Sequence, residues 1–173
     1  MAKFNKEIKL ILSVALTVWA VAQFAEGNIG YGIMLVLAAA LVILLIFRNE
    51  RILLAFYHLR KNDMEKAGAA IAKIQYPEKL VKSQEAYYYF LQGLLHSQSR
   101  GIGKAEKFFV KALNTGLRMK HDQAMAKLNL AGIFAAKRRK REAINYLNQA
   151  KKLDEKNLLG DQIKMLKSQL GRI

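Results

Sequence analysis

Residues 129–150 read NLAGIFAAKRRKREAINYLNQA, an apolar segment and an amphipathic segment separated by five consecutive basic residues. In the amphipathic segment, Ala143 and Leu147 are four residues apart and therefore fall on one face of a helix. The basic residues occupy the interval between the two segments, where a solvated turn is expected. This stretch predicts two helices, over 126–136 and 142–153, joined by a polar turn.

The same pattern occurs three times along the chain. Ala67, Ala105 and Ala143 stand at equal steps of 38 residues. Four further sets recur at this step, namely Ala55, Gly93 and Ala131; Ile71, Phe109 and Leu147; Ile74, Ala112 and Ala150; and His58, His96 and Phe134. Such repetition is typical of stacked supersecondary units, none of which can cover its own apolar face. We therefore expect about three helical units, over 48–85, 86–123 and 124–157.

The two earlier units have the same layout as the third. The second predicts helices over 84–97 and 104–113, and the first predicts helices over 48–60 and 64–74. Residues 158–173 form a final segment, which is apolar on one side at helical spacing. We expect this segment to be a helix that caps the last unit. A helix that binds a partner or a membrane surface is the alternative.

Charge is distributed unevenly along the chain. Of the 29 lysines and arginines only three precede Arg48, and of the 13 acidic residues only two do. The part from Arg48 onward therefore carries 26 basic residues against 11 acidic ones, a net charge of +15. This charge favours acidic partners, such as phospholipid headgroups, nucleic acid or acidic proteins, without choosing among them. The absence of cysteine excludes disulfides, thiolate metal sites and cysteine nucleophiles.

Two apolar runs, 8–25 and 29–47, precede the repeats. At about 1.5 Å per residue, each is long enough to cross or nearly cross a hydrocarbon core about 30 Å thick. Only the polar turn 26–28 separates them, so residues 1–47 are expected to form a transmembrane helical hairpin that contacts membrane lipids through 8–47. Since no glycine or proline follows the second run, its helix is expected to continue into the first repeat helix.

The charges that flank the hairpin predict its orientation. Lys3, Lys6 and Lys9 precede the first run, further basic residues follow the second, and the turn carries none. By the positive-inside rule, both termini and the repeats are expected on the cytoplasmic side of a two-pass protein. A second interpretation is that the first run is a signal peptide, with Ala-Val-Ala at 20–22 as its cleavage region. The repeats stay cytoplasmic in both interpretations.

The repeated residues resemble those of the tetratricopeptide repeat family of helix–turn–helix solenoids. The resemblance covers roughly residues 48–157 and is strongest in the third unit, with its NLAGIF and EAI segments. The second unit matches through Gly93, Ala105, Phe109 and Ala112, and the first through Ala55, Ala67 and Ile71. The family period is about 34 residues, and the linkers 75–85 and 114–123 lengthen it here. The resemblance implies an all-α fold, a solenoid that follows the hairpin.

The resemblance also implies that a peptide or helix of a protein partner binds in the concave groove lined by the first helix of each unit. We predict the lining from the direction of the side chains on the first helix of each unit. The residues one turn before and one turn after the small-residue positions are expected to face the groove. The residues expected there are Tyr87, Phe90, Leu94, Met125, Leu128 and Asn129. The apolar members suit a hydrophobic helix or strand, and Asn129 is expected to hold the ligand backbone. Phe90 and Leu128 are equally compatible with the core between units.

Five adjacent cations form what we call the basic turn, which consists of Lys137, Arg138, Arg139, Lys140 and Arg141. Three interpretations stay open for it: a solvated turn, a contact with anionic lipid or an acidic protein, and a contact with nucleic acid phosphates. No recognition helix, zinc-ligand spacing or aromatic–basic sheet motif accompanies it, which disfavours nucleic acid.

The sequence contains no pattern typical of a catalytic site. His58 and His96 occupy the same repeat position, which favours a structural role for both, and phosphate loops, nucleophile elbows and metal-ligand spacings are absent. We therefore expect no catalytic residue, no metal and no cofactor. The sequence favours a membrane-anchored, non-catalytic scaffold that holds a protein partner at the cytoplasmic membrane face. The alternatives are an accessory subunit of a larger membrane complex and a basic surface that binds anionic lipid or nucleic acid.

Overall fold

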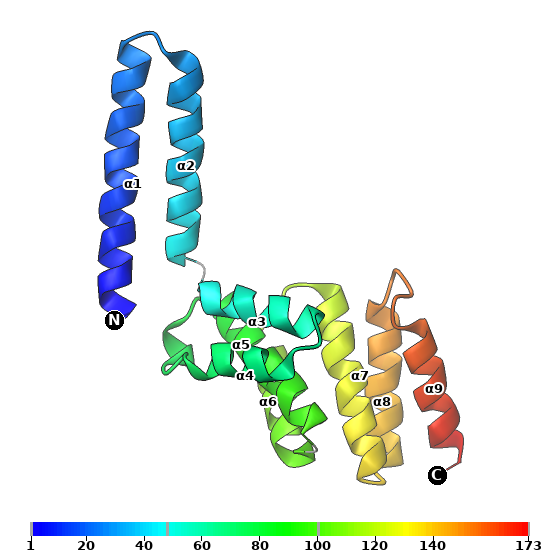
Figure 1. The fold of residues 1–173 in the computed structure, drawn as a ribbon. Coiled ribbons are helices and arrows are strands. Elements are labelled where there is room, and N and C mark those ends of the chain that lie inside the picture. Colours follow the sequence, from blue (N-terminus) through cyan, green and yellow to red (C-terminus); the bar gives the residue numbers. More distant parts are fainter. Residues whose placement is uncertain (1, 48, 100, 173) are drawn as a thin grey trace. The chain divides into compact units, whose positions relative to one another are not determined.

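The computed structural model describes residues 2–47, 49–99 and 101–172, with side chains described over 7–43, 49–99 and 101–172. Throughout these ranges the chain is helical and contains no β-strand, which confirms the all-α prediction (Figure 1). The chain divides into two compact units, Met1–Glu50 and Arg51–Ile173.

The first unit is a pair of helices, α1 (Ala2–Ala25) and α2 (Ile29–Phe47), which pack against each other (Figure 1). The chain reverses at Gly27, whose φ of +80° is a left-handed conformation that glycine adopts without steric cost. Gly32 of α2 lies against Phe24 of α1, because a Cβ at Gly32 would come within 2.7 Å of the Phe24 ring. The small residue therefore lets the two helices approach closely.

One segment of this unit, Glu7–Ala25, is long and apolar enough to cross a membrane by length and composition. Within the described side chains, the second helix contributes the shorter apolar segment Ile29–Ile43. Most large apolar side chains of both helices are exposed, including Ile11, Val18 and Leu37. The pair therefore presents an apolar surface on its outside as well as a packed seam between the helices.

The predicted helix running on from the second apolar run through 48–60 is wrong. The α2 helix ends at Phe47, Asn49 is not helical, and α3 begins at Glu50, while residue 48 lies outside the described residues. The start of α3 is tied instead to the end of α4, because the Arg51 guanidinium donates a hydrogen bond to the backbone carbonyl of Lys73.

The second unit is a succession of short helices joined by turns. They are α3 (Glu50–Arg60), α4 (Met64–Ala72), the 3-10 helix η1 (Pro77–Lys79), α5 (Lys82–Gln98), α6 (Ile102–Thr115), α7 (Lys120–Ala136), α8 (Lys140–Leu153) and α9 (Gly160–Gly171). The α5 and α6 helices pack as an antiparallel pair, as do α7 and α8, and α6 packs on α7 (Figure 1). The final helix, α9, packs on α8 and α7, and buries Leu159, Ile163 and Leu170 there.

The repeated small residues are the centre of each helix pair. Two of the repeated sets are buried throughout. One set lies in the first helices and consists of Ala55, Gly93 and Ala131, and the other lies in the second helices and consists of Ala67, Ala105 and Ala143. At Gly93 the two helices approach closely, since a Cβ there would lie 2.7 Å from Cδ1 of Phe109 on α6. The small residue on one helix thus makes room for the bulky residue of the same repeat on the other.

Stacked rings recur at the same step of the repeat. The His96 ring stacks on Phe108 with centroids 5.4 Å apart, and Phe134 stacks on Tyr146 at 5.3 Å. Both members of the first pair stand 38 residues before those of the second. The structural role predicted for His96 is therefore observed, whereas His58 contacts the neighbouring Tyr57 ring edge-on.

Candidate functional site

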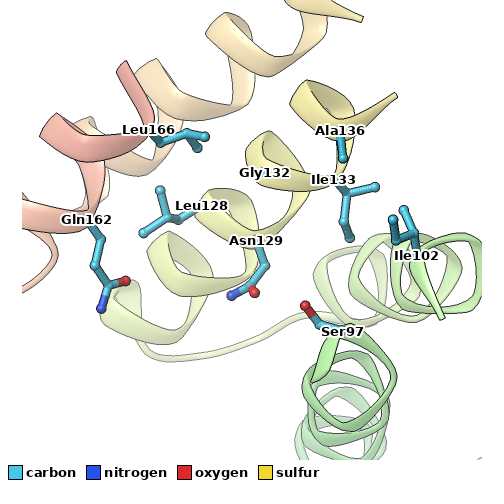
Figure 2. Close-up of a pocket in the computed structure, with 9 residues that line it drawn as sticks. All are labelled: Ser97, Ile102, Leu128, Asn129, Gly132, Ile133, Ala136, Gln162 and Leu166. Carbon is cyan, nitrogen blue, oxygen red and sulfur yellow. The ribbon is translucent and has the colours of Figure 1, made fainter. Parts of the chain in front are cut away.

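A hollow of about 300 Å³ opens on one side of α7, and we call it the α7 groove (Figure 2). Its lining comes from the end of α5, the start of α6, the second half of α7 and the middle of α9. The lining residues are Ser97, Ile102, Leu128, Asn129, Gly132, Ile133, Ala136, Gln162 and Leu166. None of them is charged, so the groove is an apolar surface interrupted by three neutral polar side chains.

The sequence of α7 accounts for the groove. Leu128, Gly132 and Ala136 follow one another at four-residue intervals and form a stripe along the helix. After Leu128 the residues of this stripe are small, and a Cβ added at Gly132 would meet no atom within 4 Å. The other sides of α7 are occupied by α6 and α8. The α7 helix, which is apolar on most sides, therefore keeps one side open. The small residues on that side make the groove deeper.

The polar side chains of the groove have unused hydrogen-bonding capacity. Asn129 donates a hydrogen bond of 2.9 Å from Nδ2 to the carbonyl of Met125, which fixes its amide and leaves Oδ1 as an acceptor. Within the described ranges, this oxygen and the side chains of Ser97 and Gln162 form no hydrogen bond. These three groups can therefore donate to or accept from the backbone of a bound segment.

Of the six residues predicted to line a partner-binding groove, Leu128 and Asn129 lie in the wall of the α7 groove, although Leu128 is only 7% exposed and also belongs to the core. Phe90 is only 1% exposed and lies in the core of the unit. Leu94 and Met125 are partly buried and pack against the same core. The residues one turn before or after the small-residue positions thus lie mostly in the interior, because neighbouring helices cover that side of the first helix.

Tyr87, the remaining residue of the predicted lining, also lies outside the groove wall and joins helices together. Its hydroxyl donates a 2.7 Å hydrogen bond to Oδ2 of Asp122 at the start of α7. Its ring meets Phe56 of α3 edge-on, with centroids 5.5 Å apart. Tyr87 therefore connects α3, α5 and α7, and its effect on a ligand would be indirect.

The other seven of the nine lining residues were not predicted from the sequence. Gly132 and Ala136 continue the four-residue series from Leu128, so the helical period could have identified them. Gln162 and Leu166 come from α9, a segment predicted only as a cap. Figure 2 shows Leu166 on the same side as Leu128, where it completes one wall.

The basic turn is partly neutralised within the unit. Lys137 forms an ion pair with Glu106 of α6, and Arg139 binds both carboxylate oxygens of Glu142. The Arg139 guanidinium also lies 4.8 Å from the centre of the Phe134 ring. The hydrogen bond to Glu142 raises the pKa of Arg139 further above its ordinary value. Lys137 and Arg139 therefore take part in contacts within the repeats.

The other three cations of the basic turn, Arg138, Lys140 and Arg141, are exposed and form no ion pair with a described residue. Arg138 has a φ of +59°, so it occupies the left-handed position of the turn. Lys140 and Arg141 belong to the first turn of α8, which corrects their predicted place in the connecting turn. All five residues of the basic turn are thus exposed, but two of them are neutralised by ion pairs within the unit.

A buried carboxylate on α5 gives the unit a defined pH dependence. Glu85 is 6% exposed, and it accepts hydrogen bonds from Lys82 at 2.8 Å and from the Tyr89 hydroxyl at 3.3 Å. The Lys82 hydrogen bond lowers the pKa of Glu85 below its ordinary value of 4.5. A carboxylate with a lowered pKa stabilises the fold above its ordinary pKa, and this contribution is lost as the pH falls through the lowered value.

We therefore expect Glu85→Gln to reduce the free energy of unfolding by about 1 kcal/mol at pH 7 and by a smaller amount at pH 3. Urea unfolding of the detergent-solubilised chain, followed by circular dichroism at both pH values, measures this. Glu155→Gln is the control, because the Lys120–Glu155 pair is exposed and should contribute little. An equal loss at both pH values would exclude ionisation of Glu85 as the cause.

No family model, curated protein or solved structure matches the chain. In the part of the chain that the structure describes, no three histidine, aspartate or glutamate side chains come together as a metal site. The lining of the α7 groove offers a ligand apolar contacts and neutral hydrogen-bonding groups.

Proposed function

We propose that the chain is a membrane-anchored adaptor whose α7 groove binds an apolar segment of a protein partner. The observation that carries this proposal is the lining of the groove, which combines apolar walls with unpaired amide and hydroxyl groups. Peptide-binding grooves use this combination, because apolar pockets select side chains and polar groups hold the backbone. Oδ1 of Asn129 would accept a backbone N–H, while Gln162 would donate to a carbonyl.

The proposed architecture is a tetratricopeptide-like solenoid with α9 as its cap. It is supported by the 38-residue step, by the buried small residues at the centre of each helix pair and by the recurring stacked rings. In this interpretation α3–α4, α5–α6 and α7–α8 are three successive units. The groove then borders the first helix α7 of the third unit, with the end of α5, the start of α6 and part of α9 as its other walls.

We further propose that α1 and α2 cross the membrane as a two-pass hairpin with both termini in the cytoplasm. The apolar outer surface of the pair supports the span, and Lys3, Lys6 and Lys9 in the first two turns of α1 support this orientation. An anchor of this kind raises the local concentration of the groove near membrane-bound partners. Because the chain lacks cysteine, single cysteines report topology without background.

We expect a membrane-impermeant maleimide to label Asn28→Cys in intact cells and to label Lys151→Cys only after permeabilisation. Labelling of Lys151→Cys in intact cells would contradict the cytoplasmic position of the repeats. An N-terminal tag separates the hairpin from the signal-peptide interpretation, since the tag is retained only if the first run is not cleaved.

A leucine at position 132 tests the groove itself. The space beside Gly132 is open, so Gly132→Leu should fill the groove without a clash in the fold. We expect this variant to lose at least about tenfold in partner affinity, equivalent to about 1.4 kcal/mol. The measurement is co-purification from membranes in mild detergent, quantified against the wild-type chain.

Gly171→Leu is the matched control, because a Cβ at Gly171 also meets no atom within 4 Å and this residue does not line the groove. Full retention of a stoichiometric membrane partner by Gly132→Leu would contradict recognition through the groove. That result would favour an accessory subunit held by its hairpin.

A further inference from the structure

The α3 helix is apolar on two sides. On one side Ile52 and Ala55 are buried in a core cluster with residues of α4 and α5. On the other side Leu53, Leu54 and Tyr57 are 45%, 48% and 52% exposed. At about 100° per residue these three fall within one third of the helix circumference. A single exposed leucine needs no explanation, but three large apolar side chains in five residues form a patch.

The residues around this patch are of the kind that lie at membrane interfaces. Arg60 and Lys61 follow at the end of α3, and the Lys61 ammonium lies 4.5 Å from the centre of the Tyr57 ring. The acidic residue of α3, Glu50, is its first residue and forms a 2.7 Å ion pair with Lys9 of α1. Leucine, tyrosine and basic residues on one helix face favour the headgroup region of a bilayer.

The chain itself limits how far α3 can begin from the end of α2. The α2 helix ends at Phe47 and α3 begins at Glu50. Three residue steps span at most about 11 Å, and the headgroup region on each side of the hydrocarbon core is about 5 to 8 Å thick. If α2 ends at the membrane surface, then α3 begins in or directly beside the headgroup layer.

We propose that the exposed face of α3, formed by Leu53, Leu54 and Tyr57, lies in the headgroup region of the membrane that α1 and α2 enter. Arg60 and Lys61 contact the lipid phosphates there. This inference rests on the proposed membrane anchor and adds to it a second, peripheral contact.

The test uses the full chain in nanodiscs of phosphatidylcholine and phosphatidylglycerol, with spin labels on single cysteines. Leu53→Cys and Tyr57→Cys probe the α3 face, Leu37→Cys probes α2, and Ile144→Cys is the control on α8. Ile144 is 41% exposed, which is comparable with Leu53. Collision with oxygen, which partitions into lipid, is compared with collision with a water-soluble nickel chelate.

We expect the oxygen-to-nickel ratio to be several-fold higher at positions 53 and 57 than at position 144, and highest at position 37. If 53 and 57 resemble 144 while 37 is shielded from nickel, the α3 contact is wrong and the anchor stands. If 37 also collides freely with nickel, both proposals fail. Shielding of 53 and 57 from both reagents would mean that protein, either a partner or a second copy, covers this face, and would overturn the lipid contact.

Discussion

Replacing Gly93 with leucine is expected to destabilise the repeats by about 3 kcal/mol or more, because the added side chain has no space. A Cβ at this position would already lie 2.7 Å from the ring of Phe109, which is itself fully buried. The ring cannot move aside without disturbing the α5–α6 pair. Domains of this size have a total stability of about 5–15 kcal/mol, so the loss is a large fraction. Urea unfolding followed by circular dichroism measures it.

The neighbouring repeat offers a matched control for this substitution. Gly132 also lies inside a first helix, but a Cβ there would meet no atom within 4 Å. Gly132→Ala should therefore leave the stability unchanged or raise it by about 0.5–1 kcal/mol, since alanine favours a helix interior. Equal stability of Gly93→Leu and the wild-type chain would show that α5 and α6 do not cross closely at Gly93.

Arginine in the middle of both apolar helices is expected to remove the chain from the membrane. Val18 and Leu37 are exposed and lie near the centres of α1 and α2. An arginine at the centre of a spanning helix costs about 2.5–3.5 kcal/mol on the insertion scale. The double variant Val18→Arg and Leu37→Arg should therefore disappear from the fraction that resists alkaline carbonate extraction.

Ile144→Arg is the control for this experiment, because Ile144 is an exposed apolar residue of the repeats. It should leave the carbonate-resistant fraction as large as that of the wild-type chain. A double variant that stays in this fraction to the same extent as the wild-type chain would contradict the spanning hairpin.

The positions of the helix pairs could be predicted because they depend on contacts repeated within each unit. Ala105 and Ala143 occupy the same repeat position, and both are small because they are buried within a helix pair. The 38-residue step between them is enough to identify the helix pairs in the sequence. The end of α2 could not be predicted in this way. Residues 48–51 contain no glycine or proline, so nothing in this stretch predicts that a helix ends there.

The groove was only partly predictable, because its walls depend on which sides of α7 are left uncovered. Phe90 and Leu128 look alike in the sequence, yet Phe90 is enclosed by α6 whereas Leu128 borders the groove. Gly132 contributes to the groove because it has no side chain that would fill the space. A glycine inside a helix does not by itself indicate such an open space. Leu166 belongs to the terminal helix, whose packing fixes one wall.

Photocrosslinking in native membranes decides whether the α7 groove holds a protein partner. A photoreactive amino acid replaces Gln162 inside the groove, and in a second chain it replaces Ile144 on the outer side of α8. We predict a discrete protein adduct from position 162 that disappears when Gly132→Leu is added, and no such adduct from position 144. Equal adducts from the two positions, or none from position 162, would contradict the adaptor.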